Sequence, residues 1–286
     1  MTLFITFVIS GLGVGAAYAL VGSGFVIVHR VTHVVNFAQG TYAVLAGMLA
    51  SKLITSGMPH GVGELLAVLV AGAAGLGVGA VVLARRDTPP FVALLITLGL
   101  VFVGLAINIL LFGQNPAPSV PILSGSVNIL GANTEWQRLL VVPIALVVFG
   151  ILGLFFERTD VGRAMTATAS NRRAAQLVGI NYRRMGLAAF AIGGLLGGIA
   201  GVLIAPSQQI SPYQDIPLAI SGFTAAVFGN LSSPWLTLLG GLFLGVVGQL
   251  LQGYGVGSFQ TQVSLILMLV ILIVRARALN AQEEAK

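Results

Sequence analysis

The sequence has very little charge and no cysteine. Asp, Glu, Lys and Arg make up only 8% of its 286 residues, whereas about 25% is usual in a soluble domain. Hydrophobic residues make up 57%, and the mean hydropathy is +1.00. A surface this poor in charge excludes an ordinary water-soluble globule, and the apolar content excludes intrinsic disorder. The absence of cysteine excludes disulfides, cysteine-ligated zinc and thiol catalysis.

What the sequence has instead is a series of long apolar runs. With histidine taken as neutral, the charge-free runs cover residues 1–29, 31–51, 65–84, 88–134, 139–156, 185–214 and 216–274. Several are long enough for one or two membrane-spanning helices of about 20 residues each. They are continuously apolar, whereas the strands of an outer-membrane barrel alternate apolar and polar residues. The sequence therefore predicts an all-α fold, a polytopic bundle of transmembrane helices.

We expect one transmembrane domain over 1–286 with eight or nine spans, some of them broken or re-entrant. The spans are placed at roughly 3–28, 35–55, 61–84, 91–113, 138–157, 185–206, 216–230, 234–254 and 259–274. Two of them are weak, because the second opens with polar Asn36 and Gln39 and the seventh covers only about half a bilayer. A broken helix is tolerated there if protein covers its bare backbone or if it lines a cavity.

The basic residues predict the orientation of the chain in the membrane. With the N-terminus outside, the outer face receives only Lys52 and Arg138. The inner face then receives the other twelve, which are Arg30, Arg85, Arg86, Arg158, Arg163, Arg172, Arg173, Arg183, Arg184, Arg275, Arg277 and Lys286. Because basic residues concentrate on the cytoplasmic side, we expect the N-terminus outside and the C-terminus inside.

Two polar segments connect the spans. The outer one, 114–137, contains three prolines and is expected to be a loop without helix. The inner one, 157–184, is the only long polar stretch. Within it, Ser170 or Asn171 suits the N-cap of a short helix that ends at Leu177, and Gly179 suits the left-handed residue that follows. We expect this helix to lie along the cytoplasmic surface.

Glycines recur four residues apart inside several spans. They are Gly11 and Gly15, Gly75 and Gly79, Gly193, Gly197 and Gly201, and Gly241 and Gly245. On a transmembrane helix this spacing lets a neighbouring backbone approach closely. It serves static packing and relative motion equally well.

The sequence shows no catalytic, metal or cofactor site. Neither Lys52 nor Lys286 follows the glycine of a GxxxxGK[ST] phosphate loop, so the chain binds no ATP through a Walker motif. The histidines lack a metal-ligand spacing. All acidic residues fall at span ends or in loops, with Glu64 the deepest, whereas a proton- or sodium-coupled transporter usually keeps an acid in its interior. A passive channel or a pathway powered by a separate subunit remains.

Uncharged polar side chains within the spans are candidates for lining a substrate pathway. They are Asn36, Gln39, Thr41, Thr97, Asn108 and Thr224. Each has the alternative role of hydrogen bonding between helices. Asn36 and Gln39 are the stronger candidates, because a spacing of three places them on one helical face beside Gly40, which permits a break.

Three segments resemble the permeases of branched-chain amino-acid ABC transporters. VVNFAQGTYAVLAG (34–47) resembles their signature stretch, GRAMTATASNRRAAQLVGIN (162–181) their cytoplasmic loop, and FTAAVFGNLSSPWLTLLGGLFLG (223–245) the segment before their last helices. The matches are collinear and reach nearly the whole chain, which is most similar to the shorter permease of the pair. The chain departs from the pattern at Gln39, where many relatives have His, and at 230–234, where relatives have a glycine-rich turn.

The resemblance implies a translocating subunit, without catalysis of its own, in a bacterial cell membrane. Its partners would be ABC ATP-binding subunits, a second homologous permease and a periplasmic or lipid-anchored substrate-binding protein. The candidate residues for docking on the ATP-binding subunit are Arg163, Asn171, Arg172, Arg173, Leu177 and Gly179. Branched-chain amino acids are the expected substrates. Urea or short amides are an alternative within the same architecture, and a stand-alone channel or secondary carrier for a small neutral solute is an alternative outside it.

Overall fold

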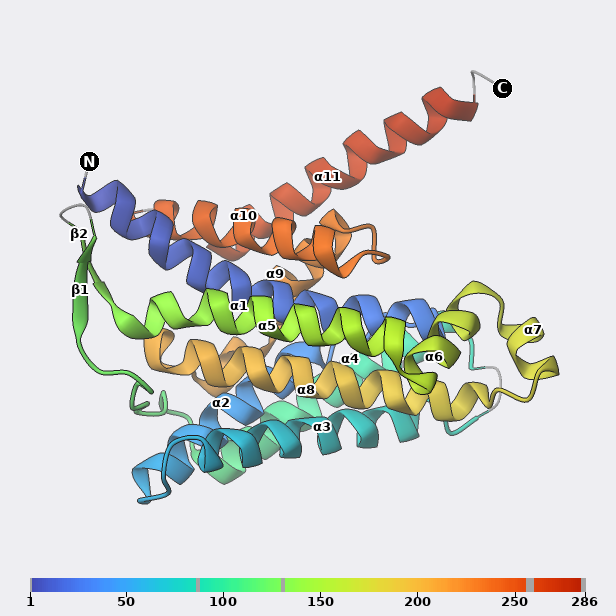
Figure 1. Ribbon diagram of the computed structural model, residues 1–286, viewed down its shortest axis with the longest axis horizontal. Coiled ribbons are helices and arrows are strands. Elements are labelled where there is room, and N and C mark those ends of the chain that lie inside the picture. Colours follow the sequence, from blue (N-terminus) through green and yellow to red (C-terminus); the bar gives the residue numbers. More distant parts are fainter. Residues whose placement is uncertain (1, 86–87, 130–131, 256–259, 284–286) are drawn as a thin grey trace.

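The computed structural model describes residues 2–85, 88–129, 132–255 and 260–283, which are mainly helical (Figure 1). The longer helices are α1 (Thr2–Thr32), α3 (Val62–Val82), α4 (Pro90–Phe112), α5 (Trp136–Arg158), α8 (Tyr182–Gln208), α10 (Pro234–Gly253) and α11 (Gln260–Glu283). The shorter ones are α2 (Gln39–Thr55), α6 (Asp160–Ser170), α7 (Arg172–Leu177), α9 (Asp215–Phe228) and the 3-10 turn η1 (Pro212–Gln214). Arg86 and Lys286, assigned to the inner face above, lie outside the described residues.

Six helices in the described part of the chain are long and apolar enough to cross a membrane: α1, α3, α4, α5, α8 and α10. This is fewer than the eight or nine spans expected. The difference lies in helix length, because α2 has 17 residues and α9 has 14, whereas a span needs about 20. Both correspond to the segments that looked weak in the sequence. Within the described residues the apolar part of α11 covers Thr261–Ile273.

The helices α2 and α9 both begin inside the bundle. Gln39, the first residue of α2, is fully buried, and Asp215, the first residue of α9, is 2% exposed. The two helix starts touch, since a side chain added at Gly40 would overlap the Asp215 carbonyl oxygen. The pair therefore forms two broken helices whose bare backbone is covered by neighbouring helices, as it must be within a membrane.

Glycine lets the central helices pack backbone against backbone. A side chain at Gly15 of α1 would overlap α10, and one at Gly245 of α10 would overlap α1. The helix α8 carries two such faces: Gly197 leaves room for α2, and Gly194 leaves room for α3. The close packing that the four-residue spacing predicts is confirmed at these positions.

Two polar segments lie at opposite ends of the bundle (Figure 1). At one end, β1 (Ser126–Ile129) and β2 (Ala132–Glu135) pair as an antiparallel hairpin. The expectation of a plain loop over 114–137 is therefore wrong in its second half, because the prolines stop at Pro121 and leave the later backbone free to pair. At the other end lie α6 and α7. We name these the hairpin end and the α7 end.

The basic residues divide between the two ends. Lys52 is in the last turn of α2 and Arg138 is in the first turn of α5, both toward the hairpin end. Arg30 and Arg158 are in the last turns of α1 and α5, toward the α7 end, and the arginines of α6 and α7 lie there too. This division is the one that the predicted orientation requires.

Candidate functional site

Polar side chains converge where the chain re-enters the bundle between α1 and α2. The Asn36 amide donates to the Tyr42 hydroxyl at 3.2 Å. The Gln39 amide nitrogen donates to the Gly193 carbonyl of α8 at 2.6 Å, while its Oε1 has no partner within the described residues. The two side chains do not share a helical face as expected, because α2 begins only at Gln39 and Asn36 precedes it. The helix break thus lies before Gly40.

Thr97 of α4 satisfies the bare backbone that leads into α2. Its hydroxyl accepts a hydrogen bond from the Phe37 N–H at 3.4 Å and lies 3.3 Å from the Val35 carbonyl. A buried backbone group without a partner is costly in free energy, so this threonine stabilises a segment that no helix supports. Thr41 extends the cluster toward α9, since its hydroxyl faces the Asp215 carboxyl group without forming a well-aligned hydrogen bond.

Asp215 is the acidic residue that the sequence analysis misplaced. It is 2% exposed against 9% for Glu64, so the expectation that Glu64 is the deepest acid is wrong. Its Oδ1 accepts from the Ile216 N–H at 2.7 Å, and its Oδ2 has no partner within the described residues. The positive end of a helix favours a carboxylate in its first turn. The signal that could have located it is the half-length apolar segment after it, because a half-length helix can start at membrane depth.

Of the two remaining pathway candidates, only Asn108 borders this cluster. It is fully buried on α4, with neither amide atom hydrogen-bonded among the described residues. It lies one turn beyond Gly104, where an added side chain would meet Thr41. Thr224 instead faces α11, with its hydroxyl 3.4 Å from the Ser264 carbonyl. The structure therefore gathers four of the six candidates around the starts of α2 and α9, places Asn108 one turn farther along α4, and leaves Thr224 apart.

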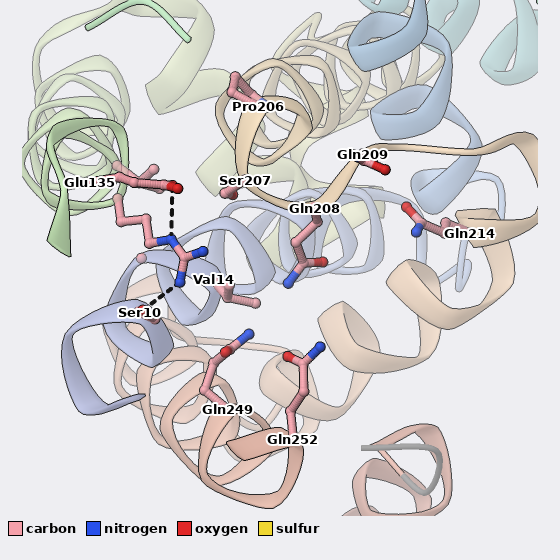
Figure 2. A pocket seen from close by; sticks show the side chains of 13 residues that line it. Ser10, Val14, Glu135, Pro206, Ser207, Gln208, Gln209, Gln214, Gln249 and Gln252 are labelled. Carbon is pink, nitrogen blue, oxygen red and sulfur yellow. Dashed lines mark hydrogen bonds and ion pairs between the residues drawn. The ribbon is translucent and has the colours of Figure 1, made fainter. Parts of the chain in front are cut away.

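A cavity of about 560 Å³ opens at the hairpin end between α1, α5, α8 and α10 (Figure 2). Its lining includes five glutamines, Gln208, Gln209, Gln214, Gln249 and Gln252. Figure 2 shows the side chains of Gln208, Gln249 and Gln252 directed toward the same space. Sequence reasoning missed them because they come from three separate segments, although the three-residue spacing of Gln249 and Gln252 on α10 is a signal that could have pointed to two of them.

An ion pair stands beside the glutamines in the cavity wall. The Arg138 Nε donates to Glu135 Oε2 at 3.2 Å, and its Nη1 donates to the Ser10 hydroxyl at 2.7 Å (Figure 2). Both charged side chains remain partly exposed, by 32% and 58%. The cavity therefore presents neutral amides together with one charge of each sign.

At the α7 end, the short helix α7 has the boundaries that the sequence predicts. Asn171 caps it by accepting from the Ala174 N–H at 3.0 Å, the helix ends at Leu177, and Gly179 has φ +87°. A separate helix, α6, precedes it and was not expected. Two apolar side chains project from the end of α7, with Leu177 88% and Val178 77% exposed.

Arginines at this end differ in how firmly they are held. The Arg172 guanidinium stacks 3.7 Å from the centre of the Tyr182 ring, which fastens α7 to the start of α8. Arg163 pairs with Asp160 one turn away at 2.9 Å, and both are exposed. Arg173 is exposed as well. An exposed apolar tip surrounded by basic residues is typical of a surface that contacts another protein.

Comparison with known proteins decides the family. The model of the family described as "Branched-chain amino acid transport system / permease component" matches residues 7–275. The chain belongs to this permease family. The permease is thus a multi-pass component of an ABC importer, in the superfamily of branched-chain amino acid and ribose permeases. Such permeases are typically non-catalytic and without cofactors, and the ATPase is not in this chain.

Relatives cover nearly the whole permease. It is 26% identical to the high-affinity branched-chain amino acid transport system permease protein LivH of Salmonella typhimurium, over 99% of this chain and 97% of the relative. It is also 26% identical to BraD of Pseudomonas aeruginosa, over 97% and 96%. The ribose import permease protein RbsC of Haemophilus influenzae is 22% identical, over 87% and 78%.

A solved structure shares the fold. It is PsaBC from Streptococcus pneumoniae in complex with Fab, with a TM-score of 0.52, 13% sequence identity, and coverage of 95% of the permease and 91% of that chain. At this identity the likeness concerns the fold alone.

Proposed function

We propose that this permease moves branched-chain amino acids inward as one subunit of an ATP-driven importer, with the hairpin end outside and the α7 end in the cytoplasm. The observation that carries the proposal is the exposed apolar tip of α7, Leu177 and Val178, on an otherwise polar segment at the basic end of the bundle. Burying such a tip against a partner stabilises the complex by removing apolar surface from water.

The partner proposed for this tip is an ABC ATP-binding subunit, and Arg163, Asn171, Arg172, Arg173 and Gly179 shape the docking surface. ATP binding biases the bundle only if the ATPase binds the inward-facing and outward-facing states with different affinity. The starts of α2 and α9 are the proposed centre of the pathway, since broken helices provide backbone groups and helix ends that recognise polar solutes. A second permease and an external binding protein complete the importer.

The substrate assignment is supported by the relatives LivH and BraD, which carry that name and match nearly the whole chain. Urea or a short amide is the alternative solute. The polar cluster contains neutral amides and hydroxyls together with the single carboxylate of Asp215. A carboxylate can accept hydrogen bonds from a neutral amide, but it binds the ammonium group of an amino acid more strongly because both groups are charged, so the cluster favours amino acids.

The test uses the double variant Leu177→Ser/Val178→Ser, co-expressed with the ATP-binding subunits. We expect normal membrane insertion, with loss of ATPase co-purification and of ATP-driven leucine uptake into proteoliposomes. The matched control is Leu123→Ser, an exposed apolar residue at the hairpin end, which should retain both. Retention of both by the double variant would contradict the docking role, and ATP-driven uptake of urea without leucine would contradict the substrate.

A further inference from the structure

The amide-lined cavity at the hairpin end has no role in the docking and pathway proposals above. We propose that it is a receiving site for the amino acid, which binds the α-ammonium and α-carboxylate groups that all amino acids share and leaves the side chain unrecognised. This inference rests on the proposed function and deepens it by assigning a first contact within the permease.

The cavity has the capacity for such a ligand. Its volume of about 560 Å³ lies within the range of small-molecule sites, roughly 300–1,000 Å³. Such sites are mostly apolar, with few polar groups, whereas this one is lined mainly by polar side chains. A solute that gains by entering it must offer polar groups that form hydrogen bonds with this lining.

The glutamines have unused hydrogen-bonding capacity. Gln208, Gln249 and Gln252 direct their amides into the shared space (Figure 2), and Gln249 is only 8% exposed. No side-chain hydrogen bond to these three amides forms within the described residues. An amide offers two N–H donors and one carbonyl acceptor. The three together can accept from an ammonium group and donate to a carboxylate.

The ion pair selects a zwitterion over a singly charged solute. Arg138 uses two of its five N–H donors on Glu135 and Ser10. The remaining donors can meet a carboxylate, and the partly exposed Glu135 can meet an ammonium group. Because the two charges cancel, a ligand with only one charge meets attraction and repulsion together.

The cavity has few apolar residues that could recognise the side chain of the substrate. Val14, Val141 and Pro206 are the larger apolar residues of the lining, too few to enclose an aliphatic chain. Glycine should therefore bind here almost as well as leucine. Selection among side chains is left to another component of the importer. The cavity adjoins the polar cluster along the chain, since Gln214 in the cavity wall directly precedes the buried Asp215 of that cluster.

The experiment measures binding of labelled leucine to the full permease complex in nanodiscs, without ATP and without binding protein. Competitors are glycine, 4-methylpentanoate, which lacks the ammonium group, and isoamylamine, which lacks the carboxylate. We expect glycine to compete as well as leucine and each singly charged analogue to compete about tenfold more weakly, the loss expected for about 1.4 kcal/mol of charge-assisted hydrogen bonding. Competition by urea, or competition by isoamylamine as strong as that by leucine, would overturn the proposal.

Variants locate the binding. Gln249→Leu should weaken leucine binding about tenfold, while Gln262→Leu on the exposed face of α11 should not change it. Arg138→Gln should weaken leucine and 4-methylpentanoate but strengthen isoamylamine, because Glu135 is left without its opposing charge, and a misfolded protein would not show this pattern. If the wild-type complex takes up leucine with ATP while both cavity variants bind leucine normally, the cavity assignment fails and the proposed function stands. If no amino acid is taken up, the proposed substrate class itself fails.

Discussion

A buried carboxylate raises the free energy of the folded state when one of its oxygens lacks a hydrogen-bond partner. Asp215 is such a carboxylate within the described residues. Its Oδ1 accepts a hydrogen bond from a backbone N–H, but its Oδ2 has no partner within the described residues, although the Thr41 hydroxyl lies near the carboxyl group. The positive ends of α2 and α9 offset part of this cost. Residues that destabilise a fold in this way are concentrated at functional sites.

We therefore expect Asp215→Asn to raise stability and lower transport. The amide keeps the shape and can donate to the Thr41 oxygen, so the free energy of unfolding should rise by about 1 kcal/mol. ATP-driven leucine uptake should fall about tenfold, since the only carboxylate of the cluster is lost. Thermal unfolding and uptake are measured together, with the exposed Asp160→Asn as control. A variant that loses stability and keeps full uptake would assign Asp215 to structure alone.

A substitution at Gln39 can distinguish a role of this side chain in transport from a role in helix packing. Its side chain runs against Gly24 of α1, where even a Cβ would overlap it, so only an unbranched replacement fits. Gln39→Met keeps that shape and removes the hydrogen bond to Gly193, worth about 1 kcal/mol. We expect assembly with the ATPase to persist and leucine uptake to fall about tenfold. Uptake equal to wild type would make Gln39 a packing residue, and Gln262→Met on α11 is the control.

At the scale of the element, α7 is fixed by its two ends. Asn171 satisfies an N–H at its start, and Gly179 takes the left-handed conformation that turns the chain toward α8. Nothing lies within 4 Å of a side chain added at Gly179. A substitution there acts through backbone conformation and not through a clash.

Gly179→Val tests this turn. A β-branched residue is strained at positive φ, by about 1–2 kcal/mol, so the end of α7 should shift and the apolar tip should lose its position. We expect normal insertion with reduced ATPase co-purification or ATP hydrolysis uncoupled from uptake. Gly179→Asn is the matched control, because asparagine tolerates the left-handed region. If valine and asparagine behave alike, the conformation of this turn does not govern coupling.

At the scale of the whole molecule, the two ends of the bundle differ in charge and in structure. The hairpin end holds the amide cavity, and the α7 end holds most of the basic residues of the described chain. Because basic residues concentrate on the cytoplasmic side of membrane proteins, we expect the bundle to insert with its basic end in the cytoplasm. The orientation can be tested directly because the protein has no cysteine.

Single cysteines at Ser124→Cys, in the exposed segment before the hairpin, and at Ser170→Cys, the last residue of α6, report the two sides. An impermeant thiol reagent added to intact cells should label position 124 and leave position 170 unlabelled until the membrane is permeabilised. The cysteine-free parent supplies the background. Labelling in the reverse order would overturn the orientation and move the amide cavity to the cytoplasmic side.

The sequence by itself determined the membrane-protein class, most helix positions and the boundaries of α7, because hydropathy and capping are local properties. It also marked 35–55 and 216–230 as irregular, since polar residues and short length show in a single segment. Only the tertiary structure decided that α2 and α9 start against each other, that Asp215 is buried, and that glutamines from three elements share a cavity. The burial of a residue and the convergence of side chains on one cavity depend on contacts between distant segments. No local pattern in the chain encodes which helix covers a given residue.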